Sequence, residues 1–189
     1  MSSLVISGDT SGAVTLAAPA VAGTNTLTLQ AATATNSVNT LATAVASTSG
    51  TSIDFTSLPS WIKKITVMFN GVSTNGASMV VVQLGTGGVP TTSGYQGAVW
   101  QTSTYTQITA GLGVNGNNGA ADARIGSMTI TNITGNTWIS ASLAFLNSAT
   151  GGGGAGVIAL GGTLNLVRIT TVNGTDTFDA GTVNIMYEG

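Results

Sequence analysis

The sequence predicts an all-β protein: a β-sandwich, jelly-roll-like in form, with an extended N-terminal arm. Three observations support this fold class: short alternating apolar runs, turn-forming Gly, Asn and Pro between them at regular spacing, and no helical period of useful length. About eight such runs follow residue 50, as is typical of a sandwich. We therefore divide the 189 residues into an arm and linker at 1–50 and a β-sandwich domain at 51–189.

The arm consists of strand-like pieces that are too short to fold alone. Apolar and small polar side chains alternate along them, so one face of each piece is apolar and needs a partner surface. The candidate partner-binding residues of the arm are Leu4, Ile6, Val14, Leu16, Leu27 and Leu29. Residues 31–50 have no clear period, and both a short helix at 37–46 and a plain linker are compatible with them.

The body begins with a short strand at 53–55 and continues with a clean apolar alternation at 64–70. Two Asn-Gly pairs then precede the apolar run 79–84, which predicts a hairpin over 64–84. A change of phase within the run 163–171 predicts either a bulge or burial on both faces. Further strands are predicted near 98–101, 105–109, 126–131, 137–146, 163–171 and 182–187.

Charge is scarce, because only 5 % of the side chains carry one and none lies between Thr10 and Ile53. Soluble proteins usually contain about 25 % charged residues, which help to keep them apart. The net charge of −2 opposes phosphate binding, and no apolar run reaches the roughly 18 residues of a spanning helix. No secretory signal is visible, so we expect synthesis in the cytoplasm. The sequence predicts an assembling protein whose partners are neither nucleic acid nor membrane.

The residue types that most catalytic sites need are missing. The chain has neither His nor Cys, which removes the usual base, the usual nucleophile and most transition-metal ligands. Asp176 and Asp179 could form a carboxylate pair or a Ca²⁺ site, but a solvated turn is the simpler interpretation. The glycine-rich run 151–156 lacks the Lys-Ser or Lys-Thr of a phosphate loop and is interpreted as a flexible hairpin loop. We expect no enzymatic activity, no metal and no cofactor.

Aromatic side chains offer a second kind of site, because exposed rings stack on sugars. Trp61 and Trp138 are expected in the core or in a subunit interface. Tyr95 lies between glycines and is expected in an exposed loop. Together with Asn115 and Asn117, it is our candidate contact for a host-surface glycan.

Two parts of the chain resemble surface proteins of tailed bacteriophages. The first is SLVISGDTSG at 3–12, continuing to APAVAGTNTLTL at 18–29. The second, IDFTSLPSWIKKITVMFNGVSTNG at 53–76, is similar to a module of phage tail-fibre and virion structural proteins. The resemblance implies a homotrimeric β-sandwich on the virion and carries over no catalytic residue.

We therefore expect a trimeric capsid decoration, or cement, protein that binds and reinforces the outer head shell. Its partners would be further copies of itself and the major capsid protein. One arm and one body are short for a tail fibre, which usually needs an anchor, a stalk and a tip. The alternative is a receptor- or carbohydrate-binding tip of a short tail fibre or tailspike, with a host-surface glycan as the partner.

Overall fold

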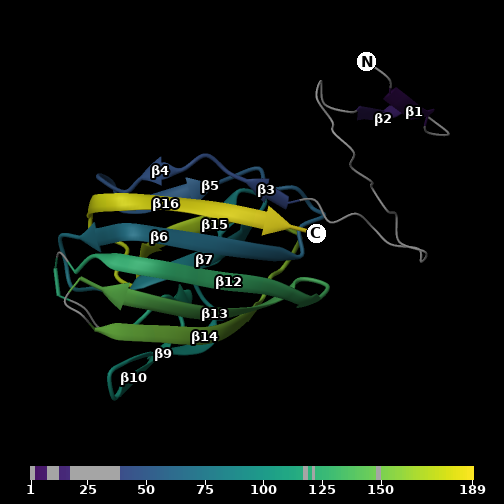
Figure 1. The fold of residues 1–189 in the computed structure, drawn as a ribbon. Helices are drawn as coiled ribbons and strands as arrows, with labels where there is room; N and C mark the ends of the chain where they lie inside the picture. The colour runs from purple at the N-terminus through teal and green to yellow at the C-terminus, as the bar shows by residue number, and fades with distance from the viewer. Residues whose placement is uncertain (1–2, 8–12, 18–38, 117–118, 121, 148–149) are drawn as a thin grey trace. The chain divides into compact units, whose positions relative to one another are not determined.

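The computed structural model describes residues 3–7, 13–17, 39–116, 119–120, 122–147 and 150–189. The chain divides into two units, Met1–Asn36 and Ser37–Gly189 (Figure 1). In the first unit, β1 (Ser3–Ser7) and β2 (Ala13–Ala17) form an antiparallel pair whose register places Leu4 opposite Leu16 and Ile6 opposite Val14. The first two strand-like pieces of the arm are thus confirmed as strands. The candidate residues Leu27 and Leu29 lie outside the described residues.

The second unit is an all-β sandwich of antiparallel sheets, which confirms the predicted fold class (Figure 1). The strands of the large sheet are β3 (Asn39–Leu41), β4 (Val45–Ala46), β6 (Lys64–Thr74), β9 (Gln96–Gln101), β10 (Thr104–Ile108), β12 (Arg124–Thr134), β13 (Thr137–Leu146), β14 (Gly151–Ala159) and β16 (Phe178–Glu188). The small sheet contains β5 (Ser52–Phe55), β7 (Val80–Thr86), β8 (Val89–Pro90), β11 (Leu112–Gly113) and β15 (Leu164–Thr171).

The order of the large sheet is β10-β9-β14-β13-β12-β6-β16-β3, with β4 also paired to β16. The order of the small sheet is β11-β7-β15-β5, with β8 beside β7. The jelly-roll form of the sandwich stays a prediction. No helix among the described residues is long and apolar enough to cross a membrane.

The core lies between the two sheets and is built by alternation along the strands. In β6, Ile65, Val67 and Phe69 are buried, whereas the side chains between them are only partly covered. Val82 and Val167 of the small sheet belong to the same apolar cluster. Removing such side chains from water at about 25 cal/mol per Å² is what holds the two sheets together.

Most strands predicted after residue 50 are confirmed, although β12 and β16 are longer than expected. The phase change predicted in 163–171 is also confirmed. The register of β15 against β7 shifts between Leu164 and Leu166, and β15 carries buried residues on both faces. A change of phase in the apolar alternation of a strand can therefore indicate a bulge.

The predicted hairpin over 64–84 is wrong. β6 lies between β12 and β16 in the large sheet, whereas β7 lies between β15 and β11 in the small sheet. Because both edges of β6 are already paired, its backbone groups leave no edge for β7. Residues 75–79 therefore carry the chain from one sheet to the other.

The linker predicted up to residue 50 is partly wrong as well. β3 and β4 pair with β16 and extend the large sheet, so neither a helix nor a plain linker covers residues 39–46, the described part of the predicted segment 37–46. The buried Ser47 hydroxyl donates to the Ala180 carbonyl oxygen at 2.7 Å and fastens this segment. The boundary between arm and body thus lies N-terminal to the one predicted.

The glycine-rich run is a strand and not a flexible loop, which corrects a third expectation. β14 lies between β13 and β9 in the large sheet. A Cβ atom on Gly154 would lie 2.7 Å from the Gly113 carbonyl oxygen. The missing side chains therefore let β11 approach the inner face of the large sheet closely.

Candidate functional site

The outer face of the large sheet is apolar, although it is directed away from the core. On β12 and β13, Ile125, Leu143 and Phe145 have exposed fractions of 54 %, 56 % and 57 %. Ile125 and Phe145 are register partners, and Leu143 lies two residues from Phe145 on the same face. We call the following set the outer apolar face: Trp100, Tyr105, Ile125, Ile139, Leu143 and Phe145.

Formal charge is nearly absent from this side of the sheet. Its outward positions carry the charged residues Lys64 and Glu188 at one end, and these form an ion pair at 2.5 Å. The other outward positions hold Ala, Gly, Ser, Thr, Asn, Gln, Met and further apolar residues. Charged residues are depleted in the core of protein interfaces, and monomers rarely expose large contiguous apolar patches. The outer apolar face therefore has the chemistry of a covered contact.

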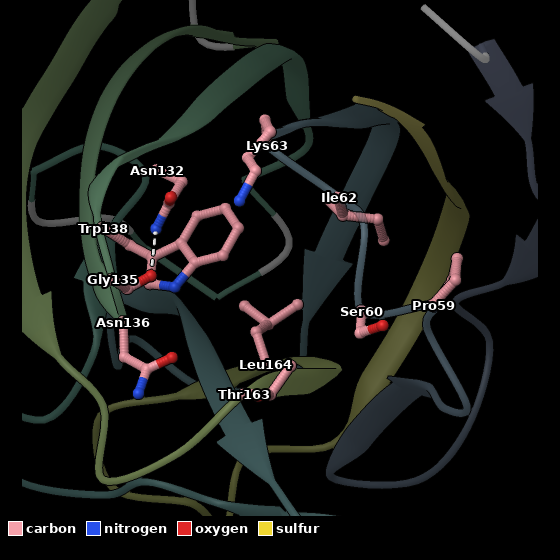
Figure 2. A pocket seen from close by; sticks show the side chains of 10 residues that line it. All are labelled: Pro59, Ser60, Ile62, Lys63, Asn132, Gly135, Asn136, Trp138, Thr163 and Leu164. Carbon is pink, nitrogen blue, oxygen red and sulfur yellow. Dashed lines mark hydrogen bonds between the residues drawn. The ribbon is translucent and has the colours of Figure 1, made fainter. Parts of the chain in front are cut away.

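A pocket lies at the end of the sandwich where β6 begins (Figure 2). It is formed by the connection between β5 and β6, the turn between β12 and β13, and the segment that enters β15. Its volume of about 170 Å³ is close to that of cavities that hold one benzene-sized ring. Its lining residues are Pro59, Ser60, Ile62, Lys63, Asn132, Gly135, Asn136, Trp138, Thr163 and Leu164.

Trp138 supplies an unusual polar group to this pocket. The side chain is 4 % exposed, as expected for a core residue, yet its indole Nε1–H has no hydrogen-bond acceptor among the described residues. A buried donor without a partner costs about 1–3 kcal/mol. Asn132 shapes the adjoining turn, because its Nδ2 donates to the Gly135 carbonyl at 2.9 Å and to the Thr137 carbonyl at 3.1 Å.

Lys63 is the cation that remains available at the pocket. Among the described residues, Lys64 pairs with Glu188, and the Arg168 guanidinium donates two hydrogen bonds to Asp54, at 2.7 and 2.6 Å. Arg124 is fully buried, and this burial lowers its pKa to about 10. The Lys63 side chain is exposed and has no ion pair within the described chain.

Two of the predicted glycan contacts are buried, which corrects the expectation that they form an exposed loop. Tyr95 is 2 % exposed, and its hydroxyl accepts from the Leu84 N–H at 2.8 Å and donates to the Thr91 carbonyl at 3.0 Å. Asn115 is also buried, and its Oδ1 accepts from Arg124 Nε at 3.2 Å. Asn117 lies outside the described residues. The glycines beside Tyr95 indicate a turn of the backbone and not an exposed ring.

Of the two carboxylates considered for catalysis or Ca²⁺, Asp176 holds a loop, and Asp179 links β16 to β6. Asp176 accepts from the Ser78 N–H at 2.9 Å and from Asn173 Nδ2 at 2.5 Å, and Asp179 accepts from the Ser73 hydroxyl. Within the described part of the chain, no three Asp, Glu, His or Cys side chains gather as a metal site would require. Both carboxylates accept local hydrogen bonds.

No family model, curated protein or solved structure matches this chain. The outer apolar face and the pocket beside Trp138 are therefore interpreted from the residues themselves. Sequence reasoning missed both, although alternation in 137–146 placed Ile139, Leu143 and Phe145 on one side and Trp138 on the other. A strand with apolar residues on both sides is a signal for a second covered surface.

Proposed function

We propose that this chain is a virion structural protein of a tailed bacteriophage, a homotrimeric capsid decoration or cement protein on the outer head shell. The observation that supports it best is the outer apolar face, which is exposed in a single copy and carries almost no charge. Such a surface favours a covering partner, and we propose further copies of this chain as that partner. The location on the virion and the trimeric state are proposed because residues 3–12, 18–29 and 53–76 resemble phage proteins.

The arm has a separate role in this proposal, which is to bind the shell of major capsid protein. Its strands β1 and β2 contain Leu4, Ile6, Val14 and Leu16, and Asp9 is the sole charged residue before Asp54. A nearly uncharged segment can be buried with little electrostatic desolvation cost. Strand addition to an exposed sheet edge would supply backbone hydrogen bonds to the partner.

Charges placed on the outer apolar face are expected to separate the copies. Leu143→Asp combined with Phe145→Asp would bury two unpaired carboxylates in the contact, so we expect the dissociation constant to rise at least about 100-fold. Sedimentation velocity measures this change, and circular dichroism checks that the sheet is retained. Val89→Asp, which changes an exposed apolar residue on the small sheet, is the control and should leave the oligomer intact. A double variant that sediments like the unaltered trimer would contradict the role of this face.

Deleting residues 2–30 is expected to leave a folded trimer that no longer decorates heads. The deletion removes β1 and β2, whereas β3, β4 and the rest of the sandwich remain. Binding is measured by incubating heads that lack the protein with either form and counting bound copies per particle on gels. In purified virions, hundreds of copies per particle are expected, and a handful would indicate a tail position. Equal binding of the truncated protein would show that the arm is not the shell contact.

A further inference from the structure

We propose that the pocket beside Trp138 binds the carboxylate of a single-ring ligand. Figure 2 shows the indole of Trp138 and the amine of Lys63 on the same side of this pocket. The first is a buried N–H donor without an acceptor, and the second is a cation without an ion pair in the described chain. Both groups are donors, so an anionic acceptor such as a carboxylate suits them.

The size and walls of the pocket limit the ligand to one ring. Its volume of about 170 Å³ is well below the 300–1,000 Å³ of sites for drug-sized ligands. Ile62, Leu164 and the Trp138 ring offer apolar surface to the faces of such a ring. An extended chain of several rings would leave most of its length outside.

The polar groups select an acceptor with negative charge. The indole N–H and the lysine ammonium are donors only, so neither can satisfy a ligand hydroxyl hydrogen. Hydrogen bonds to an ionised acceptor are shorter and roughly twice as strong as neutral ones. Ser60 and Asn136 are exposed beside them and can bind the remaining polar groups of the ring. A ring that bears a carboxylate should therefore bind more tightly than its neutral counterpart.

The backbone around the pocket is fixed before any ligand arrives. The Lys63 N–H donates to the Glu188 carbonyl at 2.9 Å, and the Lys63 carbonyl accepts from the Asn132 N–H at 2.8 Å. The Asn136 carbonyl accepts from the Leu160 N–H at 3.0 Å. A site held in this way loses little conformational entropy on binding. The same carboxylate chemistry occurs in acidic sugars and in aromatic acids.

The experiment uses the full chain labelled with 5-fluorotryptophan, in which the 3 Trp residues give separate ¹⁹F NMR signals. Trp138→Phe identifies the signal of Trp138 by its loss. Titration with glucuronate or benzoate is expected to move that signal, whereas glucose at the same concentration should not. Movement with glucuronate alone assigns a sugar source, and movement with benzoate alone assigns an aromatic acid; either supports the site.

Two adjacent lysines provide a matched pair of variants. Lys63→Gln is expected to weaken binding of the active acid at least about tenfold, because a charge-assisted contact is lost. Lys64→Gln should have little effect, because Lys64 is held by Glu188. The proposal is overturned if neither acid moves the Trp138 signal, if glucose binds as tightly, or if both variants bind alike. The pocket shares no residue with the outer apolar face, so its failure would leave the assembly experiment unaffected.

Discussion

Replacing Gly154 with alanine is expected to lower the free energy of unfolding by about 3 kcal/mol, near the upper end for an overpacked core. The added Cβ would lie 2.7 Å from the Gly113 carbonyl oxygen and 2.9 Å from Val99 Cγ1. The Ser142 hydroxyl holds this segment, because it lies 2.7 Å from the Val114 carbonyl oxygen and 3.1 Å from the Gly113 carbonyl oxygen. Relief of the contact would therefore require β11 to separate from the large sheet.

Gly161→Ala is the control, because it adds the same methyl group at an exposed glycine just after the same strand. No heavy atom beyond its chain neighbours lies within 4 Å of the added Cβ. We expect a change within about 0.5 kcal/mol, as for most surface substitutions. Urea unfolding at one fixed protein concentration, followed by tryptophan fluorescence, compares the two variants. Equal midpoints would show that the glycines of β14 are not needed for close packing.

The glycine strand shows which part of the fold local sequence could not predict. Periodicity identifies strands through alternating side chains, and residues 151–156 have almost none to alternate. Their strand conformation comes from β13 and β9 on either side and from the close approach of β11. Of these partners, β9 and β11 lie far from β14 in the sequence, so the residue types of the run alone predict a loop.

The same limit explains the wrong hairpin. Alternation at 64–70 and the apolar run at 79–84 correctly predicted two strands, because both lie against the core. Whether consecutive strands pair or cross between sheets depends on which edges are already occupied. For β6, those edges are taken by β12 and β16, which come much later in the chain. Strand positions were therefore predictable, but their pairing was not.

The candidate sites were harder to predict than the strands. Glycines beside Tyr95 correctly indicated a loop before β9, in which Gly94 has a φ of +86°. They gave no information on whether the ring points outward, and its hydroxyl is buried against Leu84 and Thr91. The pocket joins Lys63 to Trp138 and Leu164, residues that no local motif connects. Such sites depend on which strands lie side by side, and the sequence predicted the strands but not their pairing.

Tyr95→Phe is expected to lower the free energy of unfolding by about 2 kcal/mol at neutral pH. The phenyl ring can keep its place, but the Leu84 N–H and the Thr91 carbonyl lose their partner. An unsatisfied buried backbone group costs about 1–3 kcal/mol. Urea unfolding at neutral pH measures the loss.

When the pH is raised from 9 to 11, the Tyr95→Phe variant is expected to lose less stability than the unaltered protein does. Burial raises the pKa of Tyr95 to about 12, against 10.0 in the unfolded chain. Between these values the unfolded state binds fewer protons, so stability falls as the pH rises. From pH 9 to 11 this amounts to about 1.4 kcal/mol, the equivalent of one pKa unit. Phenylalanine has no proton to lose, so the difference between the two proteins should shrink by that amount.

Other groups that titrate in alkali do not affect the difference in stability between the two proteins, because both proteins contain them. Arg124 acts in the opposite direction, since burial lowers its pKa to about 10 and the unfolded state then binds more protons above that pH. This contribution cancels when the two proteins are compared at each pH. The unaltered protein, measured in the same buffers, gives the reference slope. If the Tyr95→Phe protein instead follows that slope between pH 9 and 11, the buried hydroxyl does not couple folding to protonation.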